Sequence, residues 1–468
     1  MECSSHGCTT RGQSPGGNSF GGAGMDRGPI VLGAGMTGLA AALASGLPVY
    51  ESSVAPGGIC ASYYVRPGEN IRHHSPPADG EAYRFEIGGG HWIWGADPLI
   101  LQLIGSLTPL RSYSRRAAVY LAEKDLLVPY PIQYHLGKLG SELAAQVLLE
   151  IAQGQGNTAT AETLAGWAQR HFGPTLCNLF FDPFHARYTA GLSQAIAPQD
   201  PAKSPAELPL VTKGASSSGS ADAGYNPTFF YPRGGLDALA RKFAEGSSIH
   251  YGKQVVQIDT KDRAVVFSDH SVMAYSSLVS TLPLVRALVL TNTTVDEEPD
   301  PFTSILVLNI GARKGGRCPS EHWIYVPLSE SGFHRVGFYS NVDPSFLPSS
   351  VRDGQEHVGI YVELARPGGS VLSDVQVDHI CRAVIKELRA WDWIGETEVV
   401  SSTWVETAYT WTRPGSRWVS KSLEALAKRD IHQVGRFARW ASQVKDQSIT
   451  HSIRDGLIAG AMLKKLRK

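Results

Sequence analysis

The sequence has no excess charge of either sign, few cysteines and no long apolar run. Lys plus Arg number 43 and Asp plus Glu also number 43, so no overall field attracts nucleic acid or an anionic membrane. The six cysteines are scattered without metal-ligand spacing, which favours reduced thiols over a disulfide framework or a metal site. No apolar run approaches the ~20 residues that span a bilayer. We expect a soluble, cytoplasmic protein with no nucleic-acid or membrane partner and no bound metal.

Large apolar residues are also scarce at the N-terminus, where the chain cannot bury enough surface to offset its ordering entropy. We expect residues 1–25 to form a disordered tail, with Met25 as an alternative start. The rest of the 468-residue chain exceeds one comfortable hydrophobic core, so two or three subdomains are expected.

A glycine-rich turn at 33–38 is the most informative motif present. A short apolar run precedes it and a helical pattern follows it. This order of strand, glycine-rich turn and helix is typical of sites where a dinucleotide pyrophosphate binds at the helix N-terminus. A second apolar stretch, 47–50, then delivers Glu51. The carboxylate of this residue can accept hydrogen bonds from both hydroxyls of an adenosine ribose. It therefore favours FAD or NAD, whose ribose is unphosphorylated, over NADP. The cofactor residues predicted here are Gly33, Gly35, Met36, Thr37, Gly38, Glu51 and Ser52.

Two later glycine clusters favour a flavin. Gly57 and Gly58 closely follow Glu51, as a paired glycine does in many FAD enzymes. The segment Phe85–His91 contains three glycines that permit close backbone approach, and it predicts a second cofactor contact. We therefore expect FAD as the cofactor.

The expected fold class is α/β, with a Rossmann-like FAD-binding domain, a helical insert and a β-sheet substrate domain. Apolar residues recur at helical spacing in 143–151 and 161–172, three β-rich stretches lie between 303 and 364, and a helix is predicted over 449–466. The expected organisation is a tail (1–25), three parts of the FAD-binding domain (26–95, 228–300 and 411–468), a helical insert (96–200), a flexible loop (201–227) and a substrate-domain sheet (301–410).

The ordered landmarks between about 28 and 462 resemble the UDP-galactopyranose mutase family, within the wider amine-oxidase-like flavoprotein superfamily. They are the turn at 33–38, Gly89-Gly90-His91, Val128-Pro129-Tyr130-Pro131-Ile132-Gln133, Tyr231-Pro232-Arg233-Gly234-Gly235, Trp323-Ile324-Tyr325, Phe333-His334-Arg335 and Gly435-Arg436-Phe437. The resemblance implies a pyranose/furanose mutase in which N5 of reduced FAD attacks the anomeric carbon of a nucleotide-sugar, with no net redox change. NAD(P)H is a candidate reductant. The remaining cofactor contacts expected are Gly90, His91, Val255, Gly435, Gln447 and Ser448.

The resemblance implies catalytic roles for His91, Arg335 and Arg436. A guanidinium makes forked hydrogen bonds to phosphate and keeps its charge when water is excluded, which suits a leaving diphosphate. Salt bridges remain the alternative for both arginines, and a satisfied core histidine remains the alternative for His91.

The substrate contacts expected from the resemblance are Tyr130, Gln133, Arg187, Trp323, Tyr325, Arg335, Tyr409 and Arg436. Arg187 is the further phosphate cation in this set, and a plain aromatic core is the alternative for Trp323. One departure is that Trp440-Ala441 follows Gly435-Arg436-Phe437 where the family usually offers a tyrosine that touches the diphosphate. In the preceding segment, either Tyr409 or Trp411 occupies the place of a second tyrosine.

These departures keep a second function open, an amine-oxidase-like oxidase or desaturase of a small molecule. A third hypothesis is a protein without catalytic activity that FAD stabilises as a scaffold. The retention of His91, Arg335 and Arg436 disfavours it, because burying cations costs free energy that an inactive site does not require. The partner expected is a nucleotide-sugar or another small molecule, and a homo-oligomer is left open.

Overall fold

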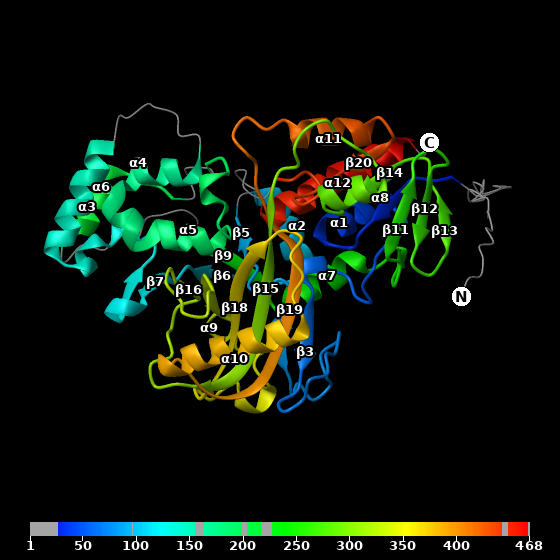
Figure 1. Cartoon of the computed structure of the whole chain (residues 1–468). Helices are drawn as coiled ribbons and strands as arrows, with labels where there is room; N and C mark the ends of the chain where they lie inside the picture. Colours follow the sequence, from blue (N-terminus) through cyan, green and yellow to red (C-terminus); the bar gives the residue numbers. More distant parts are fainter. Residues whose placement is uncertain are drawn as a thin grey trace, which may run out of the picture.

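A five-stranded parallel sheet forms the centre of one part of the molecule (Figure 1). The computed structural model describes residues 27–95, 97–154, 163–198, 204–216, 227–441 and 448–466. The sheet has the order β10-β2-β1-β14-β20, with β1 (Ile30–Leu32), β2 (Val49–Tyr50), β10 (Ile249–His250), β14 (Leu278–Ser280) and β20 (Ile431–Gln433). Segments that are far apart in sequence therefore meet in one sheet, and the expected α/β fold class is confirmed. The predicted tail and Gln447 lie outside the described residues.

Two helices distant in sequence pack directly against each other beside this sheet. They are α1 (Met36–Ser45) and α12 (Ile449–Leu466), and α12 confirms the helix expected over 449–466. Gly456 and Gly460 face α1 so closely that a Cβ atom at either position would overlap the carbonyl oxygen of Thr37 or Ala41. The other helices of this part are α7 (Leu236–Ala244), α8 (Leu284–Leu290) and α11 (Trp418–Ala427).

A seven-stranded mixed sheet forms the second layer. Its order is β19-β15-β18-β17-β16-β7-β8, with β19 (Ile394–Thr410), β15 (Phe302–Lys314), β18 (His357–Pro367), β17 (Arg335–Phe338), β16 (Trp323–Tyr325), β7 (Ala117–Leu121) and β8 (Leu126–Pro129). The helix α10 (Asp374–Ala390) packs on one face through Val384 and Leu388 (Figure 1). The three expected β-rich stretches are thus strands β15, β16 and β18, whereas β19 and α10 were not expected.

The register of this sheet places three polar residues in one row. Tyr325 on β16 pairs with Arg335 on β17, and Arg335 pairs with Glu363 on β18. Directly opposed residues on neighbouring strands share a face of the sheet, so these side chains are neighbours. The row supplies one wall of the site described below.

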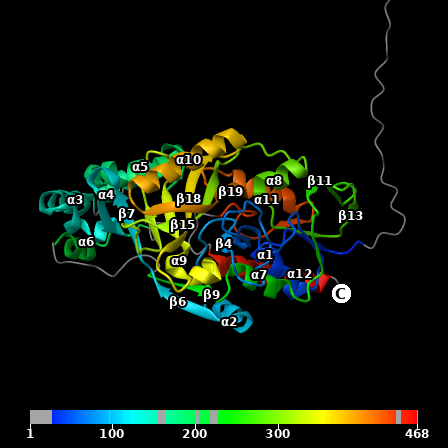
Figure 2. The same cartoon turned by 90° about the horizontal axis from the view of Figure 1, so that it is seen from below.

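A helical insert projects from one side of the molecule in both views (Figures 1 and 2). It contains α3 (Ser141–Gly154), α4 (Leu164–Leu176), a π-helical turn η5 (Cys177–Phe181), α5 (Asp182–Tyr188) and α6 (Leu208–Ala215). The expectation of helix is corrected for 110–129, where the structure has β6 (Leu110–Ser114), β7 and β8 after α2 (Pro98–Leu107).

The expected loop over 201–227 is also corrected, because α6 lies within it. Val211 is buried against the neighbouring helices of the insert, so tertiary packing outweighs the loop-like composition. Residues 201–203 and 217–226 of that expected loop lie outside the described residues.

Short elements complete the fold. They are the hairpin β3 (Ser62–Val65) and β4 (Tyr83–Glu86); β5 (Ile93–Trp94) and β9 (Thr228–Pro232), which join β6 in a sheet; β11 (Val255–Asp259), β12 (Ala264–Phe267) and β13 (Val272–Ala274); and α9 (Tyr339–Val342). Single helical turns are η1 (Gly58–Cys60), η2 (Ala122–Lys124), η3 (Ile132–Tyr134), η4 (Leu136–Leu139), η6 (Leu192–Gln194), η8 (Pro344–Phe346) and η9 (Ser349–Val351). Among the described helices, none has the length and apolar character that crossing a membrane requires.

Candidate functional site

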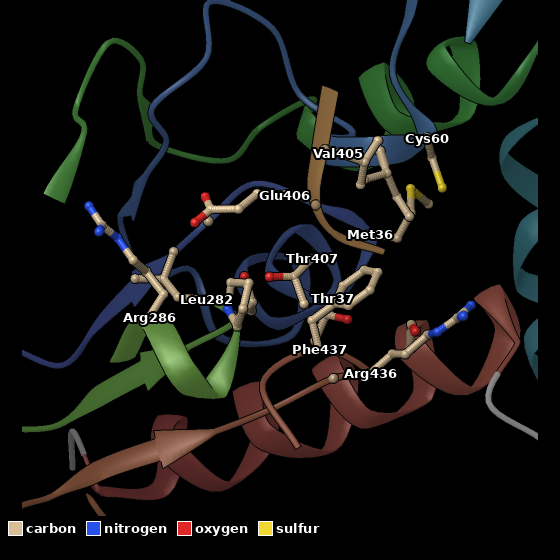
Figure 3. Close-up of a pocket in the computed structure, with 18 of the residues that line it drawn as sticks. Met36, Thr37, Cys60, Leu282, Arg286, Val405, Glu406, Thr407, Arg436 and Phe437 are labelled. Carbon is tan, nitrogen blue, oxygen red and sulfur yellow. The ribbon is translucent and has the colours of Figure 1, made fainter. Parts of the chain in front are cut away.

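A cavity of about 510 Å³ lies between the parallel sheet and strand β19 (Figure 3). It opens where β1, β2, β14 and β20 end, which is where open α/β sheets bind their ligands. Twelve of the predicted site residues line it: Gly33, Gly35, Met36, Thr37, Glu51, Ser52, Gly57, Gly58, His91, Gly435, Arg436 and Ser448.

The glycine turn forms a close-packed cradle at one end of the cavity. Gly33 has a φ of +93°, and a Cβ there would overlap the hydroxyl of Thr281. Gly38 does not line the cavity but packs on the turn itself, because a Cβ would overlap the carbonyl oxygen of Gly33. Helix α1 begins at this turn without a side-chain cap in the described structure, so its first N–H groups are available to an anion.

Glu51 stands at the end of β2, on the wall of the same cavity. It is buried, and its carboxylate accepts hydrogen bonds from the backbone N–H of Ala34 at 2.6 Å and of Ser53 at 2.8 Å. These bonds fix the carboxylate beside the glycine turn. An uncapped helix start, a turn with no room for side chains and an acid at the next strand end fit the pyrophosphate and adenosine ribose of FAD.

His91 also lines the cavity, near Arg436. Its Nδ1 lies 3.0 Å from the carbonyl oxygen of Gly89. Burial lowers the pKa of His91 to about 4, and the nearby charges of Arg436 and Arg335 act in the same direction. The imidazole is therefore neutral at physiological pH.

Arg436 lines the cavity near His91, whereas Arg335 does not line it, and the surroundings of the two arginines differ. Both guanidiniums act on His91 and on Tyr409, and that of Arg436 lies 5.9 Å from the centre of the Tyr409 ring. Arg335 donates to both carboxylate oxygens of Glu363, with Nη2 2.6 Å from Oε2. Arg335 thus forms the salt bridge that the sequence left open as its alternative.

The guanidinium of Arg436 makes no hydrogen bond or ion pair with any described residue, and its Nε is buried. Its guanidinium rests beside the rings of Tyr409 and Phe437, and Figure 3 shows it extending along the cavity end opposite Arg286. A buried N–H without a partner costs free energy until an acceptor arrives. Nε of Arg84, Arg187 and Arg335 also lacks a partner among the described residues, but of these four arginines only Arg436 lines the cavity, where an anionic ligand could reach it.

The predicted substrate residues separate into two sets. Tyr130 and Tyr325 contact each other at 4.9 Å between ring centres and lie in the same aromatic region as Tyr409 and Arg335. Trp323 is instead buried beside Trp94, Phe229 and His322, as its aromatic-core alternative proposed.

Gln133 and Arg187 already have protein partners. Gln133 is 0% exposed and donates from Nε2 to the carbonyl oxygen of Pro205 at 2.7 Å. Arg187 donates from Nη2 to the carbonyl oxygen of Ser329 at 2.9 Å, on the substrate-domain side of the insert. The structure therefore does not direct either donor toward Arg436 within the described residues.

Of the two candidates for the ambiguous tyrosine, Tyr409 lies beside Arg436 and Trp411 is buried in the core of the insert. Trp440 donates from Nε1 to the carbonyl oxygen of Trp411 at 2.9 Å and packs on Trp418 and Phe302.

Two of the predicted cofactor residues pack in the core: Val255 against the parallel sheet, and Gly90 against the ring of Tyr361.

Sequence reasoning missed much of the cavity wall. The missed residues come mainly from the ends of β14 and β20, from α8 and from β19: Ile59, Cys60, Ile87, Thr281, Leu282, Pro283, Val285, Arg286, Val289, Phe302, Trp404, Val405, Glu406, Thr407, Val434, Phe437, Ile449 and Ser452. Thr281, Leu282 and Pro283 directly follow the apolar segment that forms β14 of the parallel sheet, and this position was a usable signal. The residues of β19 carry no comparable local signal.

Comparisons with known proteins agree with this geometry. The sequence matches the flavin containing amine oxidoreductase family over residues 36–305. The structure is similar to that of reduced UDP-galactopyranose mutase, with a TM-score of 0.76, 20% identity, and coverage of 94% of this chain and 96% of that chain. It is also similar to a putative protoporphyrinogen oxidase from Exiguobacterium sp. 255-15 (TM-score 0.64, 15% identity, 95% and 100% covered) and to a double mutant of putrescine oxidase (TM-score 0.55, 15% identity, 94% and 99% covered). The comparison with curated proteins finds no match.

Proposed function

The chain belongs to the flavin-containing amine oxidoreductase family, and from that premise we propose that it is an FAD-dependent mutase that interconverts the pyranose and furanose forms of a nucleotide-sugar. The mutase and the oxidases to which it is similar share this fold, so the choice between them depends on the residues of the site. FAD, when bound in its reduced form, would supply the nucleophile for the anomeric carbon.

The observation that carries the proposal is the guanidinium of Arg436, which lines the cavity and has no hydrogen-bond or ion-pair partner among the described residues. A half-buried cation of this kind favours an anionic ligand such as a diphosphate. It disfavours a cationic amine, because like charges at a site of low dielectric repel strongly. The site electrostatics therefore support a nucleotide-sugar over an amine substrate.

The other residues have roles that follow from their positions. Arg436 would hold the diphosphate, and Tyr409 beside it would bind by hydrogen bonding or stacking. Tyr130 and Tyr325 would contact the rest of the nucleotide-sugar. The neutral His91 adds no charge of its own to the site.

The direct test is a product assay. Holoenzyme reduced with dithionite, and in parallel with NADH or NADPH, is incubated with UDP-galactopyranose and a panel of other nucleotide-sugars, and the products are separated. We expect a furanose product from at least one member of the panel. Arg436→Ala should abolish it, whereas Arg439→Ala, which alters an exposed arginine three residues away, should not. A complete absence of furanose product would reject the mutase.

A redox flavoenzyme, an oxidase or desaturase of a small molecule, is the second candidate. The observation in its favour is that Glu363 neutralises Arg335, so one of the two arginines to which the mutase resemblance gives a catalytic role is already paired within the protein. Anaerobic addition of substrate separates the two functions. A redox substrate bleaches the oxidised flavin and oxygen restores the colour, whereas a mutase substrate leaves the oxidised flavin unchanged.

A further inference from the structure

The segment Gly88–His91, called here the histidine loop, connects β4 to β5 and contacts the cavity. Ile87 and His91 at its two ends line the cavity wall. Its glycines are packed against strand β18, because a Cβ at Gly89 would lie 3.0 Å from Oε1 of Glu363 and one at Gly90 would overlap the ring of Tyr361. The loop is thus fixed on one side by the substrate-domain sheet.

Glu86 fixes the loop from the other side. Its side chain is 0% exposed, and Oε2 accepts a hydrogen bond from the backbone N–H of His91 at 3.2 Å. Its Oε1 accepts a hydrogen bond from the hydroxyl of Tyr231 on β9. Its backbone carbonyl oxygen accepts from Gly89 N–H at 3.3 Å and from Nδ2 of Asn309 at 3.1 Å. One residue therefore ties both ends of the histidine loop to the surrounding strands.

The charge state of Glu86 is set by a buried environment. Burial raises the pKa of Glu86 to about 8, although the hydrogen bond from Tyr231 and the charge of Arg84 act against this. The titratable and charged groups that face it are Arg84, Tyr231, Asp237, Cys60, Tyr339 and Tyr361. Within the described part of the chain, Nε and Nη2 of Arg84 have no hydrogen-bond partner, so no guanidinium fork holds Glu86 in its charged form.

We propose that Glu86 is a positioning residue for the histidine loop and that the charge on its carboxyl group tunes the redox potential of the bound flavin. Glu86 acts electrostatically on Cys60, and both Cys60 and His91 line the cavity. A negative charge behind this wall disfavours the extra negative charge of a reduced flavin, so ionisation of Glu86 lowers the potential. The inference depends on FAD binding, which the mutase and its redox alternative share, and does not depend on the substrate.

The experiment measures the midpoint potential of the flavin in the holoenzyme from pH 6 to 10, with reference dyes. The variants are Glu86→Gln, Tyr231→Phe and the control Glu69→Gln, which alters an exposed glutamate in the loop of the same hairpin. The wild type should show a break near pH 8. Glu86→Gln should lose this break and have the higher potential above it, and the control should follow the wild type.

Tyr231→Phe keeps the carboxyl group but removes a hydrogen bond that lowers the pKa of Glu86, so its break should move to higher pH. This second variant keeps the test valid if Glu86→Gln fails to fold or to retain FAD. A break near pH 8 that persists in Glu86→Gln, or an unmoved break in Tyr231→Phe, would overturn the proposal. A purely structural role would lower the thermal stability of both variants without altering the break. None of these outcomes depends on finding a furanose product.

Discussion

Two buried glutamates flank the histidine loop, and their pKa values are shifted in opposite directions. Glu86 is 0% exposed and Glu363 is 1% exposed. Burial acts to raise the pKa of Glu363, but Arg335 and His334 outweigh it and hold that pKa at about 2. The pKa of Glu86 is raised to about 8. Similar burial therefore accompanies opposite shifts of pKa, and the difference between the two sites is that a guanidinium bonds directly to Glu363.

The two arginines of the site show the same contrast. Arg335 is bonded to Glu363, so its charge is already compensated within the sheet. Arg436 has no ion pair with any residue in the described ranges, so its charge is available to a ligand. The comparison separates an arginine paired within the sheet from an arginine for which we propose a role in ligand binding.

Replacing Arg335 should give the largest effect on stability. Arg335→Met leaves Glu363 buried without its partner, and we expect the free energy of unfolding in urea to fall by about 3–5 kcal/mol. The double variant Arg335→Met/Glu363→Met removes both charges and should recover most of this loss. A single variant as stable as the wild type would show that the pair contributes nothing.

Replacing Arg436 should affect ligand binding and leave stability unchanged or slightly higher, because no buried partner loses its charge compensation. Loss of a charged hydrogen bond to a diphosphate costs about 1.5–3 kcal/mol, so the Kd for UDP should rise about 10- to 150-fold in Arg436→Met. Isothermal titration with UDP measures this, with Arg439→Met as the control. An unchanged Kd would remove Arg436 from the binding site.

The two glutamates should give stability profiles of opposite sign. The depressed pKa of Glu363 contributes stability that is present above pH 4.5 and lost as the pH falls toward 2. The raised pKa of Glu86 gives a contribution that is lost as the pH rises from 4.5 to about 8. Glu86→Gln should therefore gain stability relative to the wild type between pH 5 and 8, by at most about 1.4 kcal/mol per pH unit. A difference that does not vary with pH would show that Glu86 is ionised throughout this range.

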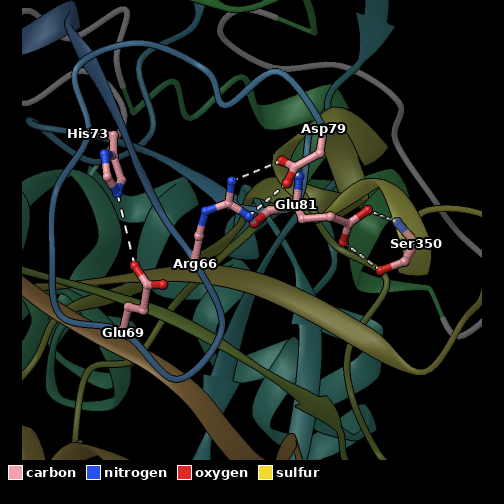
Figure 4. Close-up of polar contacts among 6 residues, drawn as sticks. All are labelled: Arg66, Glu69, His73, Asp79, Glu81 and Ser350. Atoms are coloured by element: carbon pink, nitrogen blue, oxygen red, sulfur yellow. Dashed lines mark hydrogen bonds and ion pairs between the residues drawn. The ribbon is translucent and has the colours of Figure 1, made fainter.

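An exposed ion pair should give the smallest effect. In the loop between β3 and β4, Arg66 pairs with Asp79 at 2.9 Å, and Glu81 bonds to Ser350 (Figure 4). Water screens these charges, unlike those beside the histidine loop. Arg66→Met should leave the midpoint of urea unfolding unchanged within measurement error. A clear loss of stability would mean that this loop depends on the pair.

The sequence was sufficient for the features that depend on local pattern. The glycine turn, Glu51 and the helix that became α12 have short-range signatures, and the first two line the cavity. The resemblance supplied Arg335 and Arg436. The partners of these groups could not be predicted, because they depend on tertiary structure. The bond of Glu363 to Arg335 arises from the pairing of β18 with β17, and the bond of Tyr231 to Glu86 joins strands of two different sheets. Helix α6 was missed because its packing outweighs a composition typical of loops.

The contact between α1 and α12 has a consequence for biosynthesis. The glycine turn leaves the ribosome early, whereas Arg436, Ser448 and the helix that covers α1 are translated several hundred residues later. At about 5–20 residues per second, that interval lasts roughly 20–80 s. A nascent chain can therefore expose the glycine turn before the C-terminal residues that line the same cavity have been synthesised. Stable loading with FAD has to wait for the C-terminal segment, and truncation before Gly456 should yield protein that is purified without flavin.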